Sequence, residues 1–155
     1  MKPKMLVMDV DGTLTDGHIY ISPHGEAMKA FHVQDGYAIA HILPKHGIIP
    51  VIITGRTSEI VSQRASELKI TELHQGVSDK LAVLKRIAEK YKISPGEIAY
   101  IGDDVNDLSC MAYCGISACP ADAVDAVLHQ VTYVCKRNGG SGTVREFVDT
   151  YVNIP

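Results

Sequence analysis

Several acidic side chains of this sequence follow short apolar runs, where they could act together at one site. Asp9 and Asp11 directly follow one short apolar run, and Asp103 and Asp104 directly follow another. Short apolar runs bounded by turn-forming residues predict buried strands, and an open parallel sheet binds its ligands beyond the carboxyl ends of the strands. The spacing therefore predicts one acidic site built from two strand ends, with the plainer alternative that Asp9 ends a strand and Asp11 caps a turn.

A cluster of carboxylates repels itself unless protons or a cation offset the charge. Oxygen ligands select a hard ion, and Mg²⁺ is the ion that this set favours. Thr54 ends a third apolar run, and Lys80 begins an expected helix, so the two would add hydrogen-bond donors and one positive charge. Together with turn amides they indicate a phosphate site. The alternative for Lys80 is an ordinary solvated lysine.

The elements that must position these residues alternate along the chain. Strands are expected at 5–8, 48–54, 71–74, 98–101, 116–119 and 131–135, and helices at 34–45, 58–68, 106–113, 121–128 and 143–151, with a further helix opening at Ser78. Alternating strands and helices predict an α/β fold: a three-layer, doubly wound parallel sheet in a single domain over residues 1–155. In the helix 34–45, Tyr37, Ala38 and Ile42, with Ala40 as a further candidate, are expected to form an irregular apolar stripe toward the core. The glycine-rich segment 138–142 is expected to be a flexible loop.

Residues 18–33 predict a β-hairpin around the turn formers 22–25. A hairpin free in solution should not expose as much apolar surface as Ile19, Ile21, Met28 and Phe31 would provide. An isolated hairpin is also unstable in water. We therefore expect the hairpin to pack against another subunit.

The totals exclude several classes of protein. The chain has 155 residues with 46% hydrophobic side chains, a net charge of -3 and a pI near 6.1, which disfavours nucleic-acid binding. No apolar stretch approaches the ~20 residues that a membrane span needs, and the three residues before Lys4 leave no room for a signal peptide. The four cysteines lack zinc spacing. A reduced, cytoplasmic protein is expected.

The motifs, taken in order, resemble those of a known superfamily. They are Asp9-Val10-Asp11-Gly12-Thr13, Ile53-Thr54-Gly55, Lys80 and Gly102-Asp103-Asp104-Val105-Asn106-Asp107. This series is similar to the four motifs of the haloacid dehalogenase superfamily of phosphotransferases, whose fold is Rossmann-like. The resemblance implies that Asp9 is the nucleophile and that Asp11 is the general acid and base, with its backbone carbonyl on Mg²⁺. It also implies that Thr54 and Lys80 bind phosphoryl oxygens, that Asp103 binds the metal, and that Asp104 and Asp107 support it.

Members of this superfamily usually carry a cap domain after the first motif or between the second and third. Segments 17–53 and 55–79 are too short for one once the hairpin, the helices and a strand are placed. A capless enzyme with an open site is therefore expected, and the hairpin is the candidate to shape the substrate pocket.

A closer resemblance covers residues 5–148. It rests on Asp16-Gly17, Gly25-Glu26, Lys29-Ala30-Phe31, Asp35-Gly36, Ile53-Thr54-Gly55-Arg56, Arg64-Ala65, Leu73-His74-Gln75-Gly76, Asp79-Lys80 and Gly139-Gly140-Ser141-Gly142-Thr143-Val144-Arg145-Glu146. These segments look like the 3-deoxy-D-manno-octulosonate 8-phosphate phosphatase subfamily, which are capless homotetramers whose hairpins cover neighbouring active sites. The resemblance implies Mg²⁺-dependent hydrolysis of that sugar phosphate, a step of lipopolysaccharide biosynthesis, through an aspartyl-phosphate.

The substrate stays open at this point. The sequence ends at Pro155, whereas many members of the subfamily carry a longer tail that reaches a neighbouring active site. Phosphates of nine-carbon 2-keto sugar acids are one alternative, and another small phosphate ester is a second. A non-catalytic oligomerisation module and a phosphoacceptor receiver domain are further alternatives. The joint presence of the motif residues argues against the module, and an Asp-x-Asp motif at the first strand argues against the receiver.

Substrate binding is expected at Thr54, Gly55, Arg56, Arg64 and Asp35. A 2-keto acid carries a carboxylate, which arginine can capture with two hydrogen bonds. The alternative for Arg64 is a solvated helix residue paired with a glutamate one turn further on, Glu67.

Overall fold

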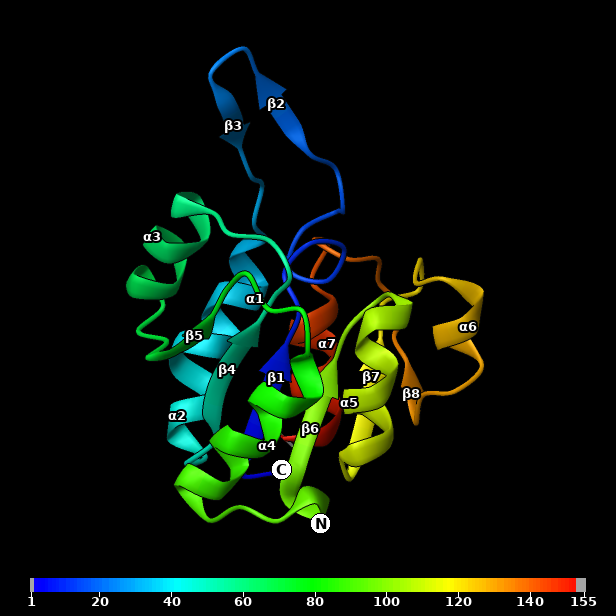
Figure 1. The fold of residues 1–155 in the computed structure, drawn as a ribbon. Coiled ribbons are helices and arrows are strands. Elements are labelled where there is room, and N and C mark those ends of the chain that lie inside the picture. The colour runs from blue at the N-terminus through cyan, green and yellow to red at the C-terminus, as the bar shows by residue number, and fades with distance from the viewer. Residues whose placement is uncertain (1, 153–155) are drawn as a thin grey trace.

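A six-stranded parallel sheet forms the middle layer of the protein (Figure 1). The computed structural model describes residues 2–152. The strands are β1 (Met5–Met8), β4 (Ile49–Ile53), β5 (Glu72–His74), β6 (Ile98–Ile101), β7 (Ile116–Cys119) and β8 (Tyr133–Val134). They lie in the order β5-β4-β1-β6-β7-β8. The predicted doubly wound parallel sheet is confirmed.

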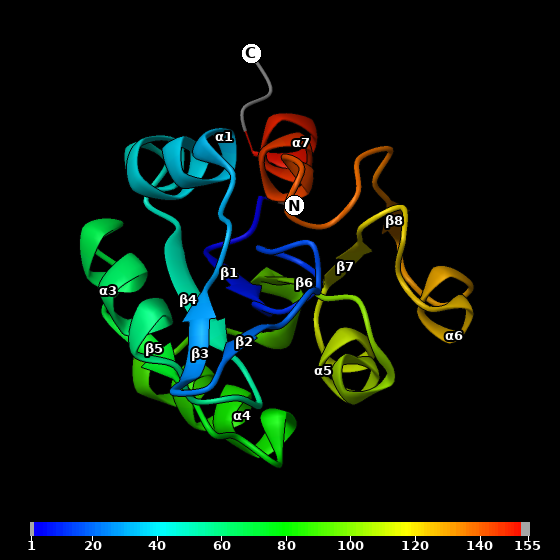
Figure 2. The same cartoon turned by 90° about the horizontal axis from the view of Figure 1, so that it is seen from above.

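Helices cover both faces of this sheet (Figure 2). They are α1 (Val33–Tyr37), α2 (Leu43–Lys45), α3 (Glu59–Glu67), α4 (Lys80–Tyr91), α5 (Leu108–Tyr113), α6 (Asp125–Leu128) and α7 (Thr143–Tyr151). Side chains from α2, α3, α7 and the turn Ala38–Ile42 that joins α1 to α2 form one apolar core, and those from α4, α5 and α6 form the other. Strands β1 and β6 are buried at every residue, because each of their faces meets one of the two cores.

The position of β1 in the sheet explains where the site lies. The chain leaves β1 toward β4 and β5 on one side and later returns to β6 on the other side. The order of the strands therefore reverses between β1 and β6, and the crevice beyond their carboxyl ends is the usual ligand site of such a sheet.

The helical segment expected at 34–45 is present but not uniform. Between α1 and α2 the chain forms a π-helical turn, Ala38–Ile42. The expectation that Tyr37 faces the core is wrong, since its side chain is 54% exposed while Ile39 and Leu43 are buried. Buried positions recur around 35–36, 38–39 and 42–43, which leaves Tyr37 on the opposite side of the turn.

The elements near the end of the sheet are shorter than expected. The helix expected at 121–128 is reduced to α6, because the residues before it bond to loops instead of to one another. The amide of Ala121 donates to the carbonyl of Arg137, and the amide of Val124 donates to that of Asp103. The strand expected at 131–135 is reduced to β8.

A β-hairpin projects beyond the carboxyl ends of the central strands (Figure 1). Its strands are β2 (Tyr20–Ser22) and β3 (Gly25–Met28), which pair antiparallel. Ile21 and Met28 are 74% and 52% exposed, which confirms part of the expected apolar surface. Phe31 is not part of that surface. It follows β3, packs against the core, and lies beneath the guanidinium of Arg64, 5.5 Å from its Cζ.

The glycine-rich segment 138–142 was expected to be a flexible loop, but it packs against the loop that follows β1. The amide of Gly140 donates to the carbonyl of Thr13 at 3.0 Å. A Cβ atom on Gly139 would lie 1.9 Å from the carbonyl oxygen of Gly12, so only glycine fits at this approach. The segment therefore supports the first motif from outside.

None of the helices between residues 2 and 152 has both the length and the apolar character that crossing a membrane requires. All four cysteines are free thiols. Three of them are buried, and Cys114 is half-buried.

Candidate active site

Three strand ends bring the predicted residues to one cleft. Asp9 follows β1, Thr54 follows β4 and Asp103 follows β6. The cleft has a volume of about 180 Å³ and is lined by Asp9, Asp11, Thr54, Gly55, Arg56, Asp103, Asp104 and Asn106. Residues from the first, second and fourth predicted motifs thus lie together beyond the carboxyl edge of the sheet.

The loop after β1 is folded tightly enough to reach Asp103. The carbonyl of Val10 accepts hydrogen bonds from the amides of Thr13, Leu14 and Thr15, which closes the turn. Gly12 has a φ of +92°, and a Cβ atom there would lie 2.1 Å from the Asp103 carboxylate. The hydroxyl of Thr13 donates to Asp103 Oδ1 at 3.0 Å. The loop thus contacts the end of β6 directly.

Lys80 lies beneath the cleft and is paired with two carboxylates. It is the first residue of α4, whose start is capped by the side chain of Asp79. Its Nζ lies 2.9 Å from Asp9 Oδ1 and 2.8 Å from Asp107 Oδ1, and its side chain is almost fully buried. The alternative of a solvated lysine is therefore wrong. In this structure the ammonium bridges two acids of the cluster.

Asp107 is completely buried and holds the cluster together. Its Oδ1 accepts from Lys80 and, at 2.6 Å, from the hydroxyl of Tyr100. Its Oδ2 accepts from the backbone amides of Asp103 at 3.0 Å and Asp104 at 3.3 Å. Asp107 also closes a capping box with Asp104 at the start of the following helical turn. Asp107 therefore caps a helical turn and supports the cluster at the same time.

The charges of the cluster are not balanced by Lys80 alone. Burial and then the charge of Asp107 raise the pKa of Asp9, although Lys80 opposes them. Burial and then the charge of Asp9 raise the pKa of Asp103 to about 8. Burial would lower the pKa of Lys80, but the charges of Asp9 and Asp107 outweigh that effect and raise it. Three carboxylates lie together with one ammonium, which pairs with Asp9 and Asp107, so a further cation would be favoured here.

The donor set fits a hard divalent cation such as Mg²⁺. Carboxylate oxygens of Asp9, Asp103 and Asp107 lie within 4.8 Å of one another. Both oxygens of Asp107 already accept hydrogen bonds, whereas the bonds that Asp9 and Asp103 accept from other described side chains fall on Oδ1. The Oδ2 atoms of Asp9 and Asp103 are therefore open to an ion that prefers oxygen ligands.

Lys29 is a site residue to which the sequence assigned no role. Its Nζ lies 2.5 Å from Asp11 Oδ1 and 3.2 Å from Glu26 Oε2. It follows the hairpin strand β3, which carries it back to the cleft. The sequence offered two signals: Lys29 stands in an otherwise apolar flank of the hairpin, three residues after a glutamate, and it belongs to one of the segments that carry the subfamily resemblance.

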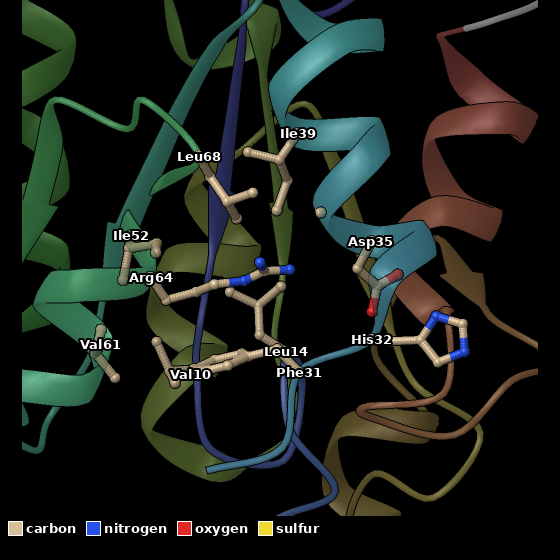
Figure 3. A pocket seen from close by; sticks show the side chains of 11 residues that line it. Val10, Leu14, Phe31, His32, Asp35, Ile39, Ile52, Val61, Arg64 and Leu68 are labelled. Atoms are coloured by element: carbon tan, nitrogen blue, oxygen red, sulfur yellow. The ribbon is translucent and has the colours of Figure 1, made fainter. Parts of the chain in front are cut away.

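Arg56 borders the acidic cleft, but Arg64 and Asp35 border a separate cavity (Figure 3). They reach this cavity from opposite sides, Arg64 from α3 and Asp35 from α1. Arg64 Nη1 lies 3.0 Å from Glu67 Oε2, so the pairing in the alternative for this arginine is confirmed, but its side chain is 20% exposed and is not solvated. Asp35 Oδ1 accepts from the amide of Arg145 at 2.8 Å, which ties α1 to the start of α7. Contact of either side chain with a substrate stays a prediction.

Comparisons with known proteins agree with this arrangement. The family model of the haloacid dehalogenase-like hydrolases matches residues 58–147. The 3-deoxy-D-manno-octulosonate 8-phosphate phosphatase of Escherichia coli strain K12 is 43% identical over 146 residues, which cover 94% of this chain and 77% of that protein.

Solved structures show the same fold. The phosphatase of the same name from Yersinia pestis superimposes with a TM-score of 0.94 at 42% identity, over 97% of this chain and 81% of the other. The Moraxella catarrhalis phosphatase, solved with a magnesium ion, a phosphate ion and a KDO molecule, gives a TM-score of 0.93 at 38% identity, over 97% of this chain and 86% of the other.

Three findings agree: the sheet has the predicted topology, the acids lie at the predicted strand ends, and the relatives match almost the whole chain. This chain belongs to the haloacid dehalogenase-like hydrolase family and is a capless relative of its 3-deoxy-D-manno-octulosonate 8-phosphate phosphatases.

Proposed function

We propose that this protein is a Mg²⁺-dependent phosphatase that hydrolyses the phosphate monoester of an acidic 2-keto-3-deoxy sugar, with 3-deoxy-D-manno-octulosonate 8-phosphate as its substrate. The observation that carries the proposal is the buried Asp9, held by Lys80 at a cleft that Thr54 and Arg56 also line. The names of the relatives at 43% and 42% identity support the choice of substrate.

Asp9 acts as the nucleophile. Lys80 holds its carboxylate at Oδ1, and a carboxylate oxygen attacks phosphorus, so that a bond from Asp9 to phosphorus forms while the bond from phosphorus to the sugar oxygen breaks. An aspartyl-phosphate and a sugar alcohol result. Forming this intermediate divides one difficult hydrolysis into two easier steps.

Asp11 handles the protons of both steps. It lines the same cleft as Asp9, two residues further along the loop. In the first step it gives a proton to the departing sugar oxygen. In the second step it takes a proton from the water that attacks the aspartyl-phosphate, and inorganic phosphate leaves.

Asp9, Asp103 and the backbone carbonyl of Asp11 would hold Mg²⁺, with Asp104 and Asp107 fixing the end of β6 behind them. When bound, the ion neutralises charge on the phosphoryl group and so lowers the barrier to its transfer. A non-catalytic module would have no reason to keep three acids so close together at an energetic cost.

The residues after β4 would bind the substrate. Thr54 and the amide of Gly55 would bind phosphoryl oxygens, and Arg56 would pair with the sugar carboxylate. Arg64 and Asp35 lie outside this cleft in a single chain, so the proposed site does not depend on them. The four free thiols support a reducing compartment, the cytoplasm, as the place of action.

We also propose that the enzyme is a homotetramer assembled through the hairpin. Exposed apolar side chains on a projecting element usually mark an interface, and Ile21 and Met28 are the exposed pair here. Ile21→Asp combined with Met28→Asp should give smaller species in light scattering and weaken sugar-phosphate turnover. A monomer at micromolar concentration of the unmodified protein would contradict the tetramer.

A phosphate-release screen with Mg²⁺ tests the proposed activity. It should include eight- and nine-carbon 2-keto sugar acid phosphates, neutral sugar phosphates and p-nitrophenyl phosphate, with Asp9→Asn as the blank. The proposal expects the highest kcat/KM for the eight-carbon acid. A preference for the nine-carbon acid would favour the alternative substrate, and no release from any ester would contradict a phosphatase.

A further inference from the structure

We propose that Lys29 positions Asp11 for proton transfer, so that the base of the hairpin belongs to the catalytic machinery of its own chain. This inference rests on the proposed function, in which Asp11 donates and accepts the protons. The side chain of Lys29 is only 2% exposed. A lysine is rarely buried to this extent unless acids pair with it.

The ammonium of Lys29 is shared by two carboxylates from different elements. Asp11 Oδ1 belongs to the loop after β1, and Glu26 Oε2 belongs to β3. Without the ammonium the two carboxylates would repel each other at short range. The Asp11 side chain would then turn away from its present direction, because among residues 2–152 the donor that holds its carboxylate is Lys29.

Glu26 is itself fixed by groups outside the hairpin. The hydroxyl of Ser58 donates to Glu26 Oε1, and the same hydroxyl accepts from the amide of Val61 as the N-cap of α3. The amide of Ser58 donates to Gln75 Oε1 at 2.8 Å. Lys29 is therefore held in place by a chain of contacts that ends on a helix and on the segment after β5.

This geometry divides the work of the two Asp11 oxygens. Lys29 occupies Oδ1, and the Asp11 residue lines the cleft where the leaving oxygen would lie, so Oδ2 is the oxygen left for proton transfer. A small displacement of a catalytic group can cost a large factor in rate. Lys29 therefore acts through Asp11, and its effect should depend on how much the leaving group needs a proton.

Two aryl esters of nearly equal shape make the test. Phenolate is a poor leaving group that gains from protonation, whereas p-nitrophenolate departs readily without it. With Lys29→Met, kcat/KM should fall about tenfold for phenyl phosphate and less than about twofold for p-nitrophenyl phosphate. Lys29→Arg should recover most of the loss. Lys45→Met, the same change at the exposed last residue of α2, should leave both values unchanged.

A purely structural role, or direct binding of the phosphate by Lys29, would lower kcat/KM for both esters by the same factor, and that result would overturn the inference. An unchanged kcat/KM for both esters would overturn it as well. Circular dichroism should confirm the fold of each variant. If Lys29→Met does not fold, Glu26→Gln removes the second anchor while keeping the lysine, and it should show the same selective loss with a smaller factor. Wild-type protein that hydrolyses neither ester would instead overturn the proposed function along with the inference, so the two failures are distinguishable.

Discussion

Two buried acidic regions of this molecule contain a carboxylate paired with a lysine, but the pKa is lowered in one region and raised in the other. At the edge of the sheet, Glu72 accepts hydrogen bonds from Lys90, from the hydroxyl of Tyr91 at 2.7 Å and from His74 at 2.9 Å. Burial alone would raise the pKa of Glu72, but these donors outweigh burial and lower it to about 2. At the centre of the sheet, the pKa of Asp103 is raised to about 8.

The number of donors explains the difference. Glu72 is one carboxylate with three donors, so its ionised form is well stabilised where it stands. In the central cluster, Lys80 pairs with two of three neighbouring carboxylates, Asp9 and Asp107, and the negative charge is only partly offset. The Glu72 region stabilises the fold. The cluster of Asp9, Asp103 and Asp107 keeps an excess of negative charge, which favours binding of a cation and, through it, of a phosphoryl group. Departures from local balance of this kind are typical of functional sites.

Removing the nucleophile should have the largest effect on turnover. Asp9→Asn should lower phosphate release by about 10⁴-fold or more, because the amide cannot form the covalent intermediate. In the absence of Mg²⁺ the same variant should be more stable than the wild type by about 1 kcal/mol, since one repelling charge has gone. Steady-state kinetics and denaturant unfolding measure the two effects.

Asp125→Asn, the same change at an exposed acid on α6, is the matched control and should alter neither quantity. Near-normal turnover by Asp9→Asn would remove that residue from its role. A loss of stability would show that the central cluster is balanced like the Glu72 region.

Adding Mg²⁺ should increase the difference between the central cluster and the Glu72 region. A chelator should abolish turnover, and Mg²⁺ should restore it, with Ca²⁺ a poor substitute because it prefers more ligands and a looser shell. Mg²⁺ at one hundred times its dissociation constant should raise stability by about 2.7 kcal/mol, which corresponds to a rise in Tm of about 5–10 °C. Asp103→Asn should lose most of that rise. Full turnover in chelator would contradict the metal site.

Breaking the edge region should have the reverse pattern. Glu72→Gln should destabilise the fold by about 2 kcal/mol, because charged hydrogen bonds to Lys90 and His74 are weakened. The expected fall in Tm is about 4–8 °C, with turnover below the melting range within about twofold of wild type. Glu89→Gln, at an exposed position of α4, is the matched control and should change neither value. A large loss of turnover in Glu72→Gln would show that the two regions are coupled.

The stabilisation from Glu72 should also depend on pH in a defined direction. Its pKa in the folded state lies below the ordinary value of 4.5. The stabilisation is therefore fully present above about pH 5 and is lost as the pH falls from 4.5 toward 2. The difference in unfolding free energy between wild type and Glu72→Gln should shrink across that interval. A difference that stays constant down to pH 2 would contradict the assigned hydrogen bonds.

Much of this site could be predicted from the sequence because its residues lie at strand ends. The apolar runs before Asp9, Thr54 and Asp103 fix where the strands stop, and parallel strands place those ends at one edge. Lys80 was placed at a helix start because a helix was expected to open at Ser78. Local patterns are enough wherever the geometry of the sheet does the rest.

Other features depend on contacts that no local pattern contains. The pairing of Lys29 with Asp11 requires the hairpin to return to the cleft, and the donors of Glu72 come from α4 and from its own strand. Tyr37 points outward because the buried positions at 35–36, 38–39 and 42–43 leave it on the opposite side of the helical segment, which its aromatic residue type alone does not reveal. These features are set by tertiary packing.

The most direct test of the central claim is to trap the covalent intermediate. The enzyme with Mg²⁺ and substrate would be quenched during turnover with borohydride, which reduces an acyl phosphate to an alcohol, and the peptide 5–29 released by trypsin would be sequenced by mass spectrometry. The account predicts homoserine at position 9 in the wild type and no reduction in Asp9→Asn or without substrate. Reduction at Asp11, or no reduced residue while phosphate is being released, would contradict Asp9 as the nucleophile.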